Sequence, residues 1–183
     1  MQRIKQIDPD TAQGKAKTLL DGVQKSLGMT PTLMRTLANS PASLEAYLGL
    51  LSSQEGMSID AKTRESIALT TSGINGCDYC AAAHTALGKM RGLSDEEAQE
   101  NLHGRSSDPE RAAILEFAST VVEKSGWVDD LDLQRARQAG LGDTEITEIV
   151  ATVATTIFSN YFNHVAQTEV DFPAVEGREK SAA

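Results

Sequence analysis

Apolar residues recur at helical spacing along almost the whole chain, and this periodicity limits the possible folds more than any other feature. In residues 41–53, for example, Leu44, Tyr47, Leu48 and Leu51 stand at positions i, i+3, i+4 and i+7, which places them on one face of a helix. Cap residues and prolines open most such segments, and glycines close several of them. No segment reads convincingly as a strand, so the sequence predicts an all-α fold.

The cap residues, prolines and glycines divide the chain into eight or nine predicted helices. The expected helices cover about residues 11–27, 32–38, 41–53, 60–72, 77–90, 94–102, 109–124, 129–139 and 143–168. We expect an extended arm at residues 1–9 and a polar tail at residues 174–183. Because no repeat or linker marks a boundary, residues 1–183 are expected to form a single helical-bundle domain.

Charge and hydropathy narrow the possible partners and compartments. The chain has 17 basic and 26 acidic residues and a net charge of −9. This balance argues against nucleic acid, whose binding depends on cationic contacts to phosphate, and against an anionic membrane surface. The N-terminus lacks the apolar run of a signal peptide, and no segment approaches the apolar length of a membrane span. We therefore expect a cytoplasmic protein without a membrane partner.

The only two cysteines, Cys77 and Cys80, are separated by two residues, and His84 follows the second after three more. Positions 77, 80 and 84 line one stripe of a helix, so the two thiols can come within disulfide reach. The positive end of the helix dipole favours a thiolate at Cys77, whereas a histidine one turn away favours one at Cys80. In a reducing compartment such a pair is more often catalytic or metal-binding than structural.

Glu65 is expected to face His84 across a helical hairpin. If the chain reverses at residues 73–76, Glu65 lies about 12 Å along one helix and His84 about 10.5 Å along the next, so they are level. A carboxylate in this place fixes the tautomer of the imidazole and raises its basicity. Glu65, His84, Cys80 and Cys77 together predict a proton relay that ends on a dithiol.

Blander interpretations of these residues remain open. Two cysteines one turn apart can be inert core residues. A zinc site is a further possibility, although no second pair of ligands completes the usual set of four, and we expect no metal. His164, in a polar segment of the last predicted helix, is either a substrate-pocket residue or a hydrogen-bonded histidine that holds helices together.

The pattern E-x11-C-x2-C-x3-H, formed by Glu65, Cys77, Cys80 and His84, resembles that of the AhpD-like alkylhydroperoxidases of the carboxymuconolactone decarboxylase superfamily. The flanking R-E-S-I-A-L, the N-G-C-D-Y-C-A-A-A-H and the late N-Y-F-N-H-V-A-Q-T-E-V-D-F-P resemble its uncharacterised peroxidase-related branch. The resemblance covers most of residues 27–173. It implies an AhpD-like helical bundle that assembles into homo-oligomers, as dimers, trimers or hexamers.

The resemblance also implies hydroperoxide reduction, an antioxidant activity that needs no bound cofactor. Cys80 would be the peroxidatic thiol that becomes a sulfenic acid, Cys77 the resolving thiol that closes the redox-active disulfide, and Glu65 and His84 the relay. An external dithiol or a lipoyl-type reductant protein would then reduce the disulfide. Tyr79 stands where AhpD itself carries a histidine, and we expect Tyr79, like His164, to line the substrate pocket.

Two other functions compete with this prediction. One is a lyase that resembles carboxymuconolactone decarboxylase and acts on a lactone acid. The other is a non-enzymatic sensor, in which the dithiol reports oxidation or binds a metal. The lyase is the weaker of the two, because decarboxylation has no use for a pair of thiols.

Overall fold

The structure is a computed structural model that describes residues 1–175, so most of the expected polar tail, residues 176–183, lies outside the described part. Residues 1–175 form nine α-helices and one 3₁₀ turn and contain no strand, which confirms the all-α prediction. The elements are α1 (Gly14–Leu27), α2 (Thr32–Leu37), α3 (Pro41–Ser53), η1 (Gln54–Gly56), α4 (Ala61–Ile74), α5 (Asp78–Met90), α6 (Asp95–Leu102), α7 (Pro109–Glu123), α8 (Asp130–Gln138) and α9 (Asp143–Ala166).

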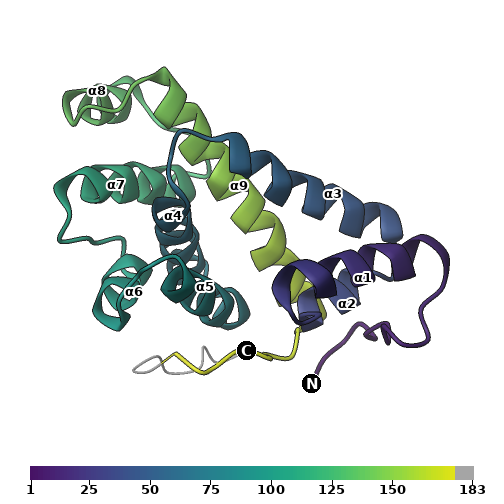
Figure 1. The fold of residues 1–183 in the computed structure, drawn as a ribbon. Helices are drawn as coiled ribbons and strands as arrows, with labels where there is room; N and C mark the ends of the chain where they lie inside the picture. Colours follow the sequence, from purple (N-terminus) through teal and green to yellow (C-terminus); the bar gives the residue numbers. More distant parts are fainter. Residues whose placement is uncertain (176–183) are drawn as a thin grey trace.

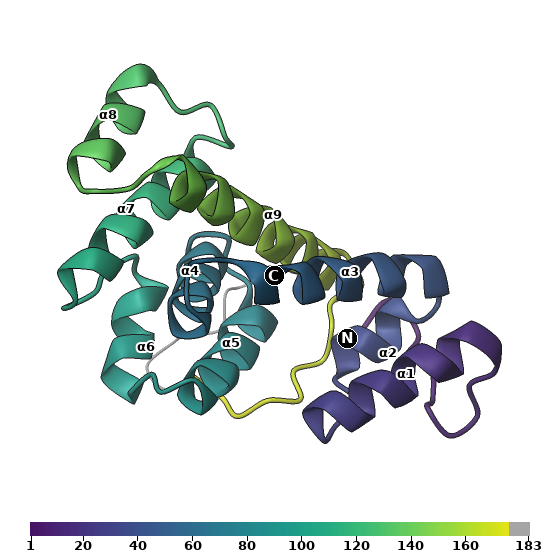
Figure 2. The same cartoon turned by 45° about the horizontal axis from the view of Figure 1, so that its top comes forward.

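Helix α4 is the central element of the fold. It packs against α5, α6, α7 and α9, which surround it in Figures 1 and 2. Residues 66–72 are all buried, and four of them are serine or threonine, whose small side chains let the neighbouring helices come close. At Gly73 a Cβ atom would overlap the backbone carbonyl oxygen of Leu102 at the end of α6. Glycine is therefore required where α4 meets α6.

The apolar core is divided between two larger clusters. The first joins α1, α2 and α3 to the start of α5, and it contains both cysteines. Its largest fully buried side chains are Leu20 and Leu44. The second lies between α4, α7, α8 and α9, around Ile67, Leu115 and Ile149. The cysteine pair thus sits in the cluster that the N-terminal helices cover.

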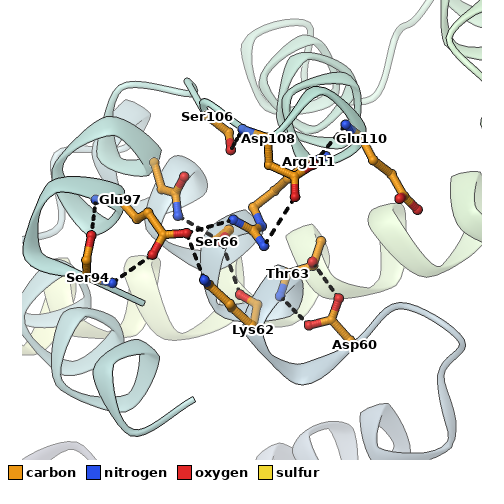
Figure 3. Close-up of polar contacts among 11 residues, drawn as sticks. Asp60, Lys62, Thr63, Ser66, Ser94, Glu97, Ser106, Asp108, Glu110 and Arg111 are labelled. Carbon is orange, nitrogen blue, oxygen red and sulfur yellow. Dashed lines mark hydrogen bonds and ion pairs between the residues drawn. The ribbon is translucent and has the colours of Figure 1, made fainter. Parts of the chain in front are cut away.

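A polar cluster joins α4, α6 and α7 near the start of α4, at the end of this helix that lies away from the cysteines. Glu97 accepts hydrogen bonds from Lys62 at 2.7 Å and from Arg111 at 3.1 Å, as Figure 3 shows. The same carboxylate accepts a hydrogen bond from the backbone amide of Ser94, and so completes the capping box of α6. One side chain therefore serves both as a cap and as the link between three helices.

Helix boundaries differ from the prediction mainly at the two ends of the chain. α1 begins at Gly14 rather than near residue 11, because Asp8 forms a turn in which its carbonyl oxygen accepts the amides of Thr11 and Ala12. α9 ends at Ala166, since Gln167 adopts the left-handed conformation. The N-terminal arm runs back to this end, where the amide of Arg3 donates to the carbonyl oxygen of Ala166 at 2.7 Å.

The starts of α2 and α5 differ slightly from the sequence pattern. The sequence places Thr30 where a hydroxyl could cap α2, but the N-cap is Pro31, and the first amides of α2 are bonded by distant residues instead of a neighbouring hydroxyl. Cys77 precedes α5 as its N-cap instead of opening the helix. Among the described helices, none combines the length and the apolar character that crossing a membrane requires.

Candidate active site

A tight reversal between α4 and α5 places the two cysteines. Gly76 has a φ of +68°, a left-handed conformation that glycine adopts without strain, and the amide of Cys77 donates to the carbonyl oxygen of Ser72 at 3.0 Å. Cys77 then caps α5, since its sulfur accepts the backbone amide of Cys80 at 3.4 Å. The two sulfurs lie 2.8 Å apart, and neither is in a disulfide. The geometry is that of a reduced pair poised for bond formation.

The polar groups around Cys80 come mainly from α9. The side-chain amide of Asn163 donates to the Cys80 sulfur at 3.1 Å, and the hydroxyl oxygen of Ser159 lies 3.8 Å from that sulfur. Tyr47 of α3 is also part of this shell, since its phenol hydrogen-bonds with Ser159. Burial raises the pKa of Tyr47, so this phenol stays protonated and acts as a hydrogen-bonding group.

The two thiols differ strongly in acidity. Burial opposes ionisation of Cys80, but the hydrogen bond from Cys77, the charge of His84 and the amides of Asn163 and Asn160 outweigh it and lower the pKa of Cys80 to about 6. The pKa of Cys77 moves the other way, because its thiol donates to Cys80 and because it is buried. At neutral pH the pair therefore holds one thiolate, on Cys80, and one thiol, on Cys77.

Glu65 and His84 meet as the hairpin geometry predicted. Nδ1 of His84 lies 2.8 Å from Oε2 of Glu65, and both side chains are largely buried. Burial favours the neutral imidazole, but the hydrogen bond and the charge of Glu65, together with Cys80, raise the pKa of His84. The raised pKa favours the protonated imidazole, whose charge in turn lowers the pKa of Cys80.

Tyr79 and His164, the two residues predicted to line the substrate pocket, have different surroundings. The Tyr79 hydroxyl accepts the backbone amide of Leu33 at 3.1 Å, and its ring meets the edge of Phe172 with ring centres 5.8 Å apart. Tyr79 therefore fastens α2 and the C-terminal segment to α5. His164 is partly exposed in the last turn of α9, and the contact with Cys80 comes from its neighbour Asn163.

The α9 residues of the site were missed because the inner face of α9 is polar. Its buried polar side chains recur at helical spacing and form a stripe: Thr152, Thr155, Thr156, Ser159, Asn160 and Asn163. This recurrence was visible in the sequence and could have directed attention to Asn163 instead of His164. Tyr47 gave no such signal, because a tyrosine among leucines is indistinguishable from an ordinary core residue.

One hollow in the described residues lies away from the cysteines. It measures about 190 Å³ and lies at the opposite end of α4, where α4, α7 and α9 begin, and it is lined by Asp60, Asp108, Arg111 and Glu145 among others. Figure 3 shows that Asp60 and Asp108 both cap the helices they precede. Within residues 1–175 no three or more histidine, cysteine or acidic side chains are arranged to hold a metal ion.

Comparison with solved structures finds the same fold in several proteins. An AhpD-core, uncharacterised peroxidase-related protein from Ralstonia eutropha JMP134 is 23% identical, with a TM-score of 0.84 over 93% of this chain and 92% of that chain. A peroxidase-related protein from Silicibacter sp. TM1040 is 20% identical, with a TM-score of 0.78 over 92% and 94%. A cysteine-to-alanine variant of the debrominase Bmp8, solved with 2,3,4-tribromopyrrole, is 17% identical, with a TM-score of 0.77 over 92% and 91%.

Sequence comparison finds one family model that matches the central part of the chain. No curated protein sequence matches the chain. Residues 41–124, which include Glu65, Cys77, Cys80 and His84, match the model of the carboxymuconolactone decarboxylase family. By this match the central part of the chain is similar to the carboxymuconolactone decarboxylase family, and the fold of the chain is that of the AhpD core.

Proposed function

We propose that the protein is a thiol-dependent hydroperoxide reductase, a dithiol–disulfide oxidoreductase that passes two electrons from an external dithiol to a hydroperoxide. The close contact of the two sulfurs beside the Glu65–His84 pair is the observation that carries the proposal, and the opposite shifts of the two thiol pKa values support it. A thiolate on Cys80 is the form that attacks an oxidant, and a thiol on Cys77, 2.8 Å away, is placed to displace the product. Inert core cysteines need no such asymmetry.

In the first step the Cys80 thiolate attacks the hydroxyl-bearing oxygen of the hydroperoxide. A sulfur–oxygen bond forms, the oxygen–oxygen bond breaks, and Cys80 becomes a sulfenic acid. The leaving alkoxide takes a proton from the imidazolium of His84, which Glu65 holds at 2.8 Å. Sulfur is oxidised by two electrons, and the peroxide is reduced to an alcohol.

In the second step the sulfur of Cys77 attacks the sulfenic sulfur of Cys80. The disulfide forms, and the hydroxyl group leaves as water with the proton that Cys77 gives up. We propose that an external dithiol, in the manner of a lipoyl-type protein, then reduces the disulfide by thiol exchange. Because the cysteines are 1% and 2% exposed, the closed site favours a small oxidant such as hydrogen peroxide over a bulky one.

Peroxide consumption with dihydrolipoamide as the electron source tests the proposal. The wild-type protein is expected to consume hydrogen peroxide and to form an intramolecular disulfide that mass spectrometry detects. Cys80→Ser is expected to abolish both, whereas Cys77→Ser is expected to stop at a sulfenic acid that dimedone traps. A wild-type protein whose thiols react no faster than free cysteine would refute the peroxidase assignment.

Reductive debromination is a second candidate, suggested by the fold shared with Bmp8. The same assay with 2,3,4-tribromopyrrole in place of peroxide, and bromide release as the readout, tests it directly. The lyase alternative makes no use of the sulfur pair. Turnover of a lactone acid that persists in Cys80→Ser would therefore favour the lyase over both thiol mechanisms.

We also propose that the protein forms homo-oligomers through the outer face of α9, defined by Val150, Ala154, Phe158, Tyr161 and Val165. These residues stand at helical spacing, and Tyr161 and Val165 are 59% and 63% exposed. The face departs from the usual pattern of a surface helix, since buried polar side chains on one side of α9 lie opposite exposed apolar ones. Residues 149–166 contain no acidic side chain, so two copies of a chain with net charge −9 meet there with the least repulsion.

Mass measurement by light scattering tests this contact. The wild-type chain is expected to have at least twice the monomer mass, and the double variant Tyr161→Glu, Val165→Glu is expected to be monomeric with an unchanged helix content. Leu131→Glu on α8 is the matched control, because Leu131 is 61% exposed but lies off this face. A double variant with the wild-type mass would exclude α9 as the interface.

A further inference from the structure

Asn163 holds the Cys80 sulfur with one end of its amide and leaves the other end unpaired. Its Nδ2 donates to the Cys80 sulfur at 3.1 Å, and the residue is only 4% exposed. Its Oδ1 is fully buried and has no hydrogen-bond partner within residues 1–175. A buried carbonyl oxygen without a partner is unfavourable and therefore calls for an explanation.

The side-chain oxygen atoms of Asn160 and Ser159, which also lie near the sulfur pair, already have hydrogen-bond partners. Oδ1 of Asn160 accepts the side-chain amide of Asn75 at 2.9 Å. The Ser159 hydroxyl donates to the carbonyl oxygen of Thr156 at 2.9 Å and is also hydrogen-bonded to Tyr47. Among these groups, Oδ1 of Asn163 is the acceptor left free beside the thiolate.

We propose that Asn163 binds the substrate, its Oδ1 accepting the O–H of the hydroperoxide while its Nδ2 holds the Cys80 sulfur. This inference rests on the proposed function and names the group that orients the oxidant. A thiolate attacks the oxygen that carries the hydrogen, along the oxygen–oxygen bond, and that same oxygen is the only hydrogen-bond donor of an alkyl hydroperoxide. One amide that holds both partners brings the reacting atoms together in the required alignment.

The chemistry of the step is unchanged and balances as before. The sulfur–oxygen bond forms to the oxygen that Asn163 holds, the oxygen–oxygen bond breaks, and the alkoxide leaves with the proton of His84. The hydrogen held by Oδ1 stays on the new sulfenic acid of Cys80, so Asn163 gains and loses no proton. Asn163 therefore favours substrates that have an O–H on the attacked atom, and it gives no such advantage to an alkylating agent.

The test compares two reactions of the same thiolate. All variants are made in the Cys77→Ser background, in which Cys80 is the only thiol, and the rate constants for hydrogen peroxide and for iodoacetamide are taken at the high-pH plateau. Asn163→Leu, which removes the acceptor, is expected to lower the ratio of oxidation to alkylation about tenfold. Asn163→Asp, which keeps an acceptor oxygen but loses the donor, is expected to keep the ratio within about threefold of that of the parent.

Asn101→Leu is the matched control, because Asn101 is also a buried amide with an unpaired Oδ1, but it lies on α6 and donates to Ser66. Its ratio is expected to equal that of the parent. If the leucine variant at position 163 does not fold, Asn163→Ala replaces it with the same expected direction. An unchanged ratio in the variant that lacks the acceptor, in a parent that peroxide oxidises quickly, overturns the role of Asn163 alone. A parent that peroxide does not oxidise quickly overturns the proposed function and this inference with it.

Discussion

Removing the thiol of Cys77 should shift the pH at which Cys80 becomes reactive. The Cys77 thiol lies 2.8 Å from the Cys80 sulfur and is the strongest of the groups that stabilise the thiolate. A hydrogen bond to a charged group contributes about 1.5–3 kcal/mol, which is about one to two pKa units. In Cys77→Ala the pKa of Cys80 should therefore rise from about 6 by this amount.

The size of the effect depends on the pH of the measurement. At a pH near the wild-type pKa, about half of the wild-type Cys80 is thiolate, so a rise of one to two units slows alkylation about 5- to 50-fold. Well above both pKa values, the two proteins should react at the same rate. The assay is the iodoacetamide rate from about pH 5 to about pH 10, with the modified cysteine identified by mass spectrometry.

Two further variants make this measurement decisive. Cys77→Ser keeps a hydroxyl donor in the same place, so its midpoint should stay much closer to that of the wild type. Cys80→Ser leaves Cys77 alone and buried, and this thiol should react slowly at neutral pH. An alanine variant that titrates like the wild type would show that Cys77 does not stabilise the thiolate, and fast alkylation of Cys77 at neutral pH would reverse the assigned roles.

Three other predictions follow from other contacts in the structure. Glu65→Gln should lower the pKa of His84, because the carboxylate that raises it is lost, and NMR titration of the ring checks this. Gly73→Ala should lower Tm by about 5 °C, since its Cβ would overlap a backbone carbonyl of α6, whereas Gly49→Ala, with open space around it, should not lower it. Hydrogen bonds from lysine and from a backbone amide lower the pKa of Glu97 to about 2, so this group stabilises the fold above its unfolded pKa of about 4.5 and loses the effect as the pH falls through 2. Glu97→Gln should cost about 1 kcal/mol at neutral pH and nothing below pH 2, as measured by urea unfolding.

The hairpin at the centre of the site could be predicted because local rules determine it. A glycine-bracketed break between two helices sets where the chain reverses, and a rise of about 1.5 Å per residue then sets which residues are level. This was enough to bring Glu65 opposite His84. The same local rules gave most helix starts, since Ser40, Asp60 and Ser94 each cap a helix with their own side chains.

The α9 contribution could not be predicted in this way. Periodicity shows that α9 has one polar and one apolar stripe, and the usual rule buries the apolar stripe. Here Asn163 is buried and Tyr161 is exposed, so the rule points to the wrong face. The structural role of Tyr79 could not be predicted either, because it depends on contacts with Leu33 and Phe172, which are far away in the sequence.

Helix α2 has a consequence for the order in which the protein folds. With six residues it is too short to be stable alone. Its first two amides are bonded by Asp171, 139 positions away, and by Tyr79, 46 positions away. Because such distant contacts form only after long loops have closed, α2 should become ordered after both α5 and the segment around Asp171 are in place. Since α2 helps to cover the cysteines, a newly synthesised chain should expose a reactive dithiol until the segment around Asp171 has docked.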